Sequence, residues 1–449
     1  MNTRRSIALV AAALFASVAL GAAGASAAPP TQTDATAVVE WNEVAANTLA
    51  AIPGADGGAP PAFQINMGMT QGAVYDAVAA IGTKQYQPYV LKQRFGAKAS
   101  IEAAVATAAY EVLTHLVSTA PELAPFPGRA GLLAALDTEY TTSINAIVVA
   151  ESFKDQGIAA GLAAADAMLH ARQDDGRFGP SQWVRDPRPG HWSPLLNSSG
   201  QEVLDPTPWV GGVEPFLVDS AEQFRSAPPL ALDSPEYAAE FNQVLNLGRA
   251  TGSTRTADQT YIAKWWQWPP ILAWNDVARQ LITRNDLSAA DAARLLALQN
   301  LSGADAAITC WSDKYYYDFW RPWNAIPRAG EDGNEATTAD TGWTALITAP
   351  YPEHPSGHNC LDGAHSTVLR MFFGDVVAGG FQMTSTSALL VAGEPRTRTF
   401  QTFSQPCAEL IDARIWAGLH FHHGDVEAQR LGVNVAQYGA AHHLQAVRH

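Results

Sequence analysis

Apolar residues recur at helical spacing through most of the first half of this chain, and this pattern constrains the fold more than any other feature of the sequence. The pattern occupies residues 37–52 and 66–81, and it continues in Ala-rich segments at roughly 100–118, 128–148 and 150–172. Alanine and leucine are among the strongest helix formers. No comparable alternation of the kind that predicts strands accompanies these segments. The sequence therefore predicts an all-α fold, a helical bundle with long loops.

A stretch rich in Pro, Gly, Trp and Asp, residues 173–230, interrupts the helical pattern. Pro and Gly at this density do not sustain a regular element. A loop of this length in a compact domain usually has a function, so we expect it to cover the mouth of a site. Helices are predicted to resume at Ser234-Pro235, at 256–267, at 270–284 and from Ser288 toward Trp320, where Ser288 and Asp291 resemble a capping box.

Three regions follow from this pattern. Residues 1–28 read as a signal peptide, 29–230 as an N-terminal helical region with the long loop, and 231–449 as a C-terminal helical region that carries the candidate site. The chain has 449 residues and is 47% hydrophobic, so it can bury a large core. We expect the second and third regions to form one continuous domain.

The N-terminus has the order of a secretory signal. Arg4 and Arg5 precede an apolar run from Ile7 to Ala23, and Ala25-Ser26-Ala27 follows. The segment Thr3–Ile7 also loosely resembles a twin-arginine signal, which would imply export in the folded state. The apolar run is shorter than a membrane span requires, and no other uninterrupted run of that length follows. The sequence therefore predicts a soluble protein that is secreted or periplasmic.

Charge and cysteine content narrow the partners and the covalent structure. The net charge is −15, and loss of Arg4 and Arg5 with the signal makes it −17, which argues against nucleic acid or an anionic membrane as a partner. Three cysteines in an oxidising compartment allow one disulfide and leave one thiol. We predict that Cys360 pairs with Cys407 and that Cys310 stays free.

The stretch from Tyr351 to Ser366, YPEHPSGHNCLDGAHS, carries the first candidate site residues. The residues after His358 read as a helix, so Ser356 and Gly357 would lie at its N-terminus, where free N–H groups and the helix dipole attract anions. His358 would place an acid/base beside this oxyanion cradle. The alternative is an ordinary N-cap with no ligand.

Two further segments carry cations and histidines. Lys314 and Arg321 are seven residues apart, which on one helix would direct both side chains from the same face, before Pro322 ends or kinks the helix. The alternative for this pair is a solvated face with aromatic packing. Arg414 and His420 could reach one ligand only if the helix ends or bends near Gly418.

The histidines of the third segment leave two other readings open. A single His420 could be structural. With His422 and His423 beside it, a divalent metal site is a further possibility, although the spacing H-x-H-H matches no common zinc pattern.

Taken together, the three segments follow the order K-x6-R-P, P-S-G-H and R-x3-G-x-H. In this signature, from Lys314 to Asp425, the chain resembles the vanadium-dependent haloperoxidases and the related phosphatidic acid phosphatase type 2 acid phosphatases. The helical N-terminal half, beginning near VVEWNEVA, resembles the secreted bacterial haloperoxidase-like branch. The resemblance implies vanadate as cofactor, with hydrogen peroxide, a halide and a small-molecule substrate as reaction partners, and it requires neither haem nor flavin.

The resemblance also implies a role for each residue of the signature. The residues that would hold the oxygens of vanadate or phosphate are Lys314, Arg321, Arg414, Ser356 and Gly357. His420 would be the axial residue, which coordinates vanadium or, in a phosphatase, attacks phosphorus. His358 would be the acid/base that takes a proton from hydrogen peroxide, and Lys314 would polarise the bound peroxide.

The chain departs from the family pattern at two positions. Ala413 replaces the usual Ser before the Arg. The phosphatases carry Asp four residues after the axial His, where this chain has Gly424 and places Asp425 one residue later. We expect Asp425 to orient His420 after a local change of the backbone. The alternatives to a haloperoxidase are an acid phosphatase with a phosphohistidine intermediate and a non-catalytic oxyanion-binding protein.

Overall fold

The computed structural model describes residues 35–82, 85–181 and 183–447, and these residues are mostly helical, which confirms the all-α prediction. The predicted signal peptide, residues 1–28, lies outside them. Within the described ranges, no helix combines the length and the apolar character that crossing a membrane requires. The described residues all belong to one compact unit of the chain.

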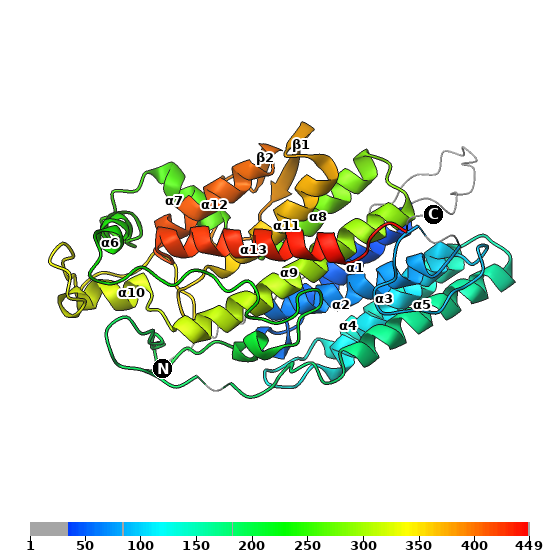
Figure 1. Ribbon diagram of the computed structural model, residues 1–449, viewed down its shortest axis with the longest axis horizontal. Helices are drawn as coiled ribbons and strands as arrows, with labels where there is room; N and C mark the ends of the chain where they lie inside the picture. Colours follow the sequence, from blue (N-terminus) through cyan, green and yellow to red (C-terminus); the bar gives the residue numbers. More distant parts are fainter. Residues whose placement is uncertain (1–34, 83–84, 182, 448–449) are drawn as a thin grey trace, which may run out of the picture. The chain divides into compact units, whose positions relative to one another are not determined.

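The first helices follow the predicted segments closely (Figure 1). They are α1 (Thr36–Ala50), α2 (Pro60–Ala79), α3 (Ile101–Thr119), α4 (Arg129–Ala146) and α5 (Glu151–Ala171), with a short 3-10 turn, η1 (Gly54–Asp56), before α2. Helix α2 begins six residues before the predicted start at Asn66, because Pro60 lies in its first turn, where proline is tolerated. The predicted long loop follows α5, and the described part of it has one helical element, the 3-10 turn η2 (Pro208–Gly212).

The second half contains the elements that build the candidate site. They are α6 (Pro235–Leu247), α7 (Ala257–Trp265), α8 (Pro270–Arg284), α9 (Ala289–Tyr317), α10 (Pro322–Ala325), η3 (Ile326–Glu331), α11 (Gly357–Phe373), α12 (Ser404–Trp416) and α13 (His422–His442), with β1 (Val376–Thr384) and β2 (Thr397–Thr402) between α11 and α12. The predicted caps at Ser234 and Ser288 are present, since each serine side chain accepts a hydrogen bond from the third backbone N–H of its helix.

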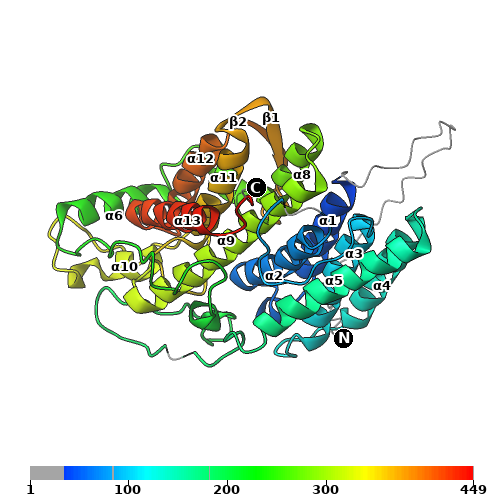
Figure 2. The ribbon, with the colours of Figure 1, turned by 45° about the vertical axis from the view of Figure 1, so that its right-hand side comes forward.

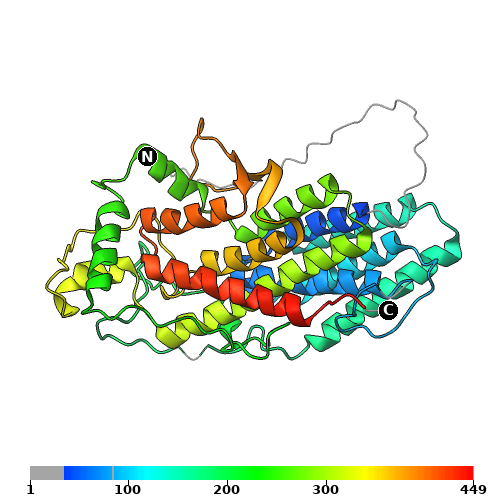
Figure 3. The same cartoon turned by 45° about the horizontal axis from the view of Figure 1, so that its top comes forward.

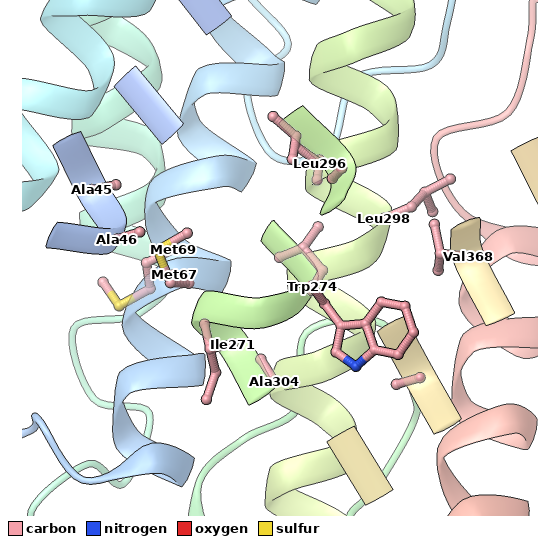
Figure 4. Packing of buried hydrophobic residues seen from close by; sticks show 14 of the residues in the cluster. Ala45, Ala46, Met67, Met69, Ile271, Trp274, Leu296, Leu298, Ala304 and Val368 are labelled. Atoms are coloured by element: carbon pink, nitrogen blue, oxygen red, sulfur yellow. The ribbon is translucent and has the colours of Figure 1, made fainter. Parts of the chain in front are cut away.

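Helix α9 is the central element of the bundle. It runs from the helices α1–α5 to the region that contains α6 and α10 (Figures 1 and 2), and it packs against α2, α11 and α13. Gly68 on α2 permits this close approach, because a Cβ there would lie 3.1 Å from the Cβ of Ala304 on α9. Figure 4 shows apolar side chains of the core around α9, among them Trp274 on α8, Leu298 on α9 and Val368 on α11.

Buried amides connect the N-terminal helices to the helix that begins at the candidate site. The Asn275 side chain on α8 accepts a hydrogen bond from Asn42 (2.8 Å) and exchanges hydrogen bonds with Asn300 on α9. Gln64 on α2 donates to the Asn300 carbonyl (2.9 Å) and accepts from His365 on α11 (2.8 Å). Because buried polar groups are stable only when paired, this network fixes the register of five helices.

Two helix ends place the candidate residues. Helix α9 ends at Tyr317 because Asp318 adopts a left-handed conformation (φ 47°), so Arg321 lies outside it, at the N-cap position of α10. The prediction that Lys314 and Arg321 project from one face of one helix is therefore wrong. The predicted break near Gly418 is confirmed, since α12 ends at Trp416, Gly418 has φ 75° and α13 begins at His422 (Figure 3).

A hairpin and the cysteines also differ from expectation. Strands β1 and β2 pair antiparallel between α11 and α12, and the sequence analysis did not anticipate them. The predicted disulfide between Cys360 and Cys407 is wrong, because all three cysteines are free and buried. Cys360 hydrogen-bonds with Cys310, whereas Cys407 lies beside Asp362 and Ser366.

Candidate active site

The three predicted segments converge on one buried cluster. Lys314 comes from α9, Arg321 from the start of α10, Ser356 and Gly357 from the start of α11, and Arg414 from α12, while His420 lies just before α13. Arg321 contacts His420 directly, and Lys314, Arg414 and His358 lie close enough to that imidazole to lower its pKa. The structure therefore brings all the predicted site residues together.

The N-terminus of α11 is open toward this cluster. Ser356 occupies the N-cap position, but its side chain makes no capping hydrogen bond, and its N–H donates to the Gly424 carbonyl (3.0 Å). The N–H groups of the first helical turn have no partner within the helix. A Cβ on Gly357 would lie 3.0 Å from the Trp311 ring, so only glycine keeps this turn in place without displacing the indole. These N–H groups form a potential anion-binding cradle.

Arg321 is fully buried and only partly satisfied. Its Nε donates to the Tyr351 carbonyl (3.0 Å), and its Nη1 donates to the Leu419 carbonyl (2.7 Å) and to Nε2 of His420 (3.0 Å). Its Nη2 has no hydrogen-bond partner among the described residues. Burial lowers the pKa of Arg321. The guanidinium is therefore a desolvated cation whose Nη2 is available to donate to a ligand.

Arg414 is in a similar state with fewer contacts. Its Nη1 donates to the Gln267 side chain (3.2 Å), and its Nε has no partner in the described part of the chain. Burial lowers its pKa to about 10. An anion near Arg321 and Arg414 would compensate both charges and take up both free donors.

Lys314 is also buried, but its ammonium is fully engaged. It donates to the backbone carbonyls of Pro352, Glu353 and Pro355, so it holds the segment that precedes Ser356 against α9. Burial lowers its pKa to about 8. Lys314 therefore lies within the cluster, and a direct contact with an oxyanion stays a prediction.

His420 is held at both ring nitrogens. Its Nδ1 donates to Oε1 of Glu353 (2.7 Å), so its Nε2 carries the lone pair that accepts from Arg321. Burial, with Arg321 and Arg414 next in size, lowers the pKa of His420 well below its usual range. A neutral imidazole with Nε2 unprotonated is the form that can coordinate a metal centre or act as a nucleophile.

Glu353 is the residue that sequence reasoning missed. It lies within the quoted YPEHPSGH stretch, three residues before Ser356, and it is buried beside His420. Its burial raises its pKa to about 7, which Arg321 and Lys314 oppose. An acid this close to the P-S-G-H motif was a usable signal, but its partner lies 67 residues away in sequence.

His358 supplies the second imidazole. Its Nε2 is buried and has no hydrogen-bond partner among the described residues, and the ring hydrogen-bonds to the Trp268 backbone. Burial, followed by the charge of Arg414, lowers the pKa of His358 well below its usual range. A neutral His358 can accept a proton at the site.

Asp425 does not orient His420, so that expectation is wrong. Its Oδ1 accepts a hydrogen bond from Asn359 (2.8 Å), and its carboxyl group also contacts Ser356. Asp425 lies at the start of α13, and its side chain contacts the N-terminus of α11. The hydrogen bond at Nδ1 of His420 is made by Glu353 instead. The carboxylate therefore supports the serine of the cradle.

The divalent-metal alternative finds no support in the described residues, where no three His, Cys, Asp or Glu side chains gather around a common point. His422 is half-exposed and lies 3.8 Å from a Glu240 oxygen. His423 stacks on His354 and donates to the Pro228 carbonyl (3.0 Å). The cluster of Lys314, Arg321, Arg414 and two neutral histidines fits an oxyanion instead.

Comparison with known proteins agrees with the motif-based resemblance. Residues 294–449 match the family model for the VCPO second helical-bundle domain. Over 200 residues the chain is 22% identical to the vanadium chloroperoxidase of Curvularia inaequalis, a match that covers 37% of this chain and 32% of that protein. The matched region thus spans about a third of that relative. The predicted relation to the vanadium-dependent haloperoxidase superfamily is confirmed.

Two solved structures share the fold over most of the chain. The first bacterial vanadium-dependent iodoperoxidase structure superposes with a TM-score of 0.71 at 22% identity, and the alignment covers 94% of this chain and 99% of that one. A holo-type bacterial vanadium-dependent chloroperoxidase superposes with a TM-score of 0.69 at 16% identity, over 91% and 97% of the two chains. These similarities show that the chain has the helical haloperoxidase fold.

Proposed function

We propose that this protein is a vanadate-dependent haloperoxidase that uses hydrogen peroxide to oxidise a halide to a hypohalous acid equivalent. One observation carries the proposal. Buried donors on Arg321 and Arg414 lack partners among the described residues, and they accompany a neutral imidazole, His420, whose Nε2 is free of a proton. An oxyanion whose central atom can accept one more ligand would pair with both donors and with His420 Nε2.

The residues of the cluster fit vanadate. Arg321, Arg414 and the N–H groups at Gly357 would donate hydrogen bonds to its oxygens, Lys314 would add positive charge, and His420 would bind the vanadium through Nε2. Bound vanadate supplies a Lewis acid that activates peroxide without a change in its own oxidation state. The chain provides desolvated cations that hold the anion, and burial keeps bulk water away from it.

His358 is suited to the proton transfer that peroxide requires. Its lowered pKa keeps the ring neutral, and its buried Nε2 is the nitrogen without a protein partner. The hydrogen bond to the Trp268 backbone fixes the ring through its other nitrogen. We therefore assign His358 Nε2 as the atom that accepts a proton from hydrogen peroxide.

The test is a halogenation assay on the purified protein. After reconstitution with orthovanadate, the protein should brominate a phenol-type indicator when hydrogen peroxide and bromide are both present. His358→Ala should lose most of this activity and keep its affinity for vanadate. Elemental analysis should find vanadium bound in both proteins. Vanadium-loaded protein without any halide oxidation would refute the proposal.

An acid phosphatase is the second candidate, because Glu353 supplies the carboxylate that a phosphohistidine mechanism requires at His420 Nδ1. Turnover of p-nitrophenyl phosphate without halogenation would favour this candidate. Oxyanion binding without either activity would identify a non-catalytic binding protein. The proposal also includes export, on the signal pattern of residues 1–28, and fractionation of the source cells tests that part.

A further inference from the structure

Among the described residues, Glu353 is the hydrogen-bond partner of Nδ1 of His420. Its Oε1 accepts from that nitrogen at 2.7 Å and from the backbone N–H of Phe421 at 3.2 Å. Both side chains are 1% exposed. One carboxylate oxygen therefore fixes the imidazole ring and the backbone of the next residue together, which limits rotation of the ring and movement of the loop that carries it.

The two neighbours of the ring select one tautomer. Arg321 has only donors, so its contact with Nε2 (3.0 Å) requires a lone pair on that nitrogen. Glu353 accepts at Nδ1, so the proton lies there. If Glu353 could not accept, the proton would have no partner at Nδ1, and the tautomer that presents Nε2 to the oxyanion site would lose its support.

Gly424 stands where the related phosphatases carry an aspartate, and its lack of a side chain leaves room for the Glu353 carboxylate beside His420. A Cβ on Gly424 would lie 2.6 Å from Oε1 and 3.0 Å from Oε2 of Glu353, which is closer than real Cβ contacts. The Glu353 carboxylate thus occupies the space that a side chain at 424 would enter. Asp425, the neighbouring acid, is engaged with Asn359 and Ser356 on the other side.

We propose that Glu353 is the positioning residue for His420 and that it replaces, from a different segment, the aspartate that related phosphatases carry at the position of Gly424. The role belongs to the oxyanion site and in that sense rests on the proposed function. The exchange is reciprocal: a carboxylate at 353 requires glycine at 424, and a carboxylate at 424 requires a short side chain at 353.

Four variants test the exchange: Glu353→Ala, Glu353→Gln, Gly424→Asp, and Glu353→Ala combined with Gly424→Asp. Affinity for orthovanadate is measured by equilibrium dialysis. Glu353→Ala and Gly424→Asp should each weaken it by about 10- to 100-fold, as loss of a residue supporting a metal-binding histidine does. The double variant should bind more tightly than either single one. Glu353→Gln keeps an acceptor oxygen and should stay within about threefold of the parent.

A second measurement follows the tautomer without vanadate and without any assay of activity. Long-range proton–nitrogen NMR on protein labelled with nitrogen-15 histidine reports which ring nitrogen carries the proton, and His420→Gln assigns the signal. The Nδ1–H form should dominate in the parent, in Glu353→Gln and in the double variant, and it should decline in Glu353→Ala.

The outcomes separate this inference from the proposed function. A parent without peroxidase activity whose His420 tautomer still depends on Glu353 would refute the haloperoxidase and retain the positioning role. An unchanged tautomer and unchanged vanadate affinity in Glu353→Ala would overturn the positioning role. A double variant no better than Glu353→Ala would overturn the exchange. If Glu353→Ala does not fold, the double variant decides: a folded double variant with the Nδ1–H form and vanadate affinity close to that of the parent supports the inference, and a folded double variant that lacks both contradicts it.

Discussion

Two kinds of buried charge occur in this bundle, and they differ in how completely the chain pairs them. Asp76 on α2 accepts hydrogen bonds from the N–H groups of three consecutive loop residues, 89–91, at 2.7–2.8 Å. Asp305 on α9 accepts from the N–H groups of residues 216–218 at 2.6–3.0 Å. Each carboxylate ties a loop to a helix and is saturated by backbone donors.

The cations of the candidate site are buried to the same degree but are not saturated. Arg321 and Arg414 each keep a buried donor with no partner in the described residues, and Nε2 of His358 is a buried acceptor without one. An unpaired buried polar group is costly, so chains rarely retain several in one place without a function. Single unpaired atoms also occur on buried charged side chains elsewhere, such as Asp56 and Asp362, so neither burial nor one unpaired atom marks a site. Several unpaired atoms on cations and an imidazole around one point do.

The largest effect should come from breaking a saturated carboxylate. Asp305→Ala removes the acceptor of three buried N–H groups, and we expect the free energy of unfolding to fall by about 4 kcal/mol, since each such group costs roughly 1–3 kcal/mol and water will reach some of them. Urea denaturation near neutral pH measures the change. The folded fraction of Asp305→Ala should still bind orthovanadate as the parent does.

Asp305→Asn is the matched control, because it keeps one acceptor oxygen and nearly the same volume. Its loss should be smaller, about 2 kcal/mol. A loss below about 1 kcal/mol in Asp305→Ala would show that the saturated carboxylate contributes no more than an ordinary surface contact.

The positions of most helices were predictable because their signals are local. Ser234 with Pro235 marks the start of α6, and Pro270 marks that of α8, through capping and the fixed backbone angle of proline. The end of α9 was not predictable in the same way. It depends on Asp318 in a left-handed conformation, which is held by hydrogen bonds from Trp183 and His191 in the distant loop.

The residues of the site were predictable from the order of the motifs. Their hydrogen-bond partners, which set the tautomer of His420 and engage the ammonium of Lys314, were not. The break at Gly418 follows from the local requirement that Arg414 and His420 meet. The link between Glu353 and His420, by contrast, exists only after two separate segments pack together. Likewise, the engagement of Lys314 with three carbonyls depends on the path of residues 352–355 rather than on the spacing between Lys314 and Arg321.

The next prediction concerns an oxyanion that binds to the unpaired donors of Arg321 and Arg414. Phosphate or orthovanadate at about a hundredfold excess over its dissociation constant should raise the free energy of unfolding by about 2.7 kcal/mol, because it binds only the folded protein. Arg414→Met should lose this response. Without the anion, the variant should be as stable as the parent or more so, since an incompletely paired buried cation gives way to an apolar side chain of similar length.

Thermal denaturation with and without the anion measures both parts of that prediction. Asp305→Asn should respond to phosphate as the parent does, which separates structural charge from ligand-binding charge. Equal melting temperatures of the parent with and without saturating oxyanion would contradict the assignment of the spare donors to a ligand.

The smallest effect concerns Lys314, which combines features of both groups because it is a site cation with saturated donors. Burial lowers its pKa from 10.5 to about 8, so in this range the unfolded chain binds more protons than the folded one and stability rises with pH. Relative to Lys314→Met, the anion-free parent should therefore gain about 1 kcal/mol between about pH 8 and about pH 9. Urea denaturation of both proteins at each pH measures the difference between their free energies of unfolding. The variant lacks the contacts with the carbonyls at every pH, so their loss adds a constant to this difference and does not change its slope with pH. A difference that does not change with pH would mean that Lys314 stays charged through this range, because the three carbonyls that it contacts offset the cost of burying its charge.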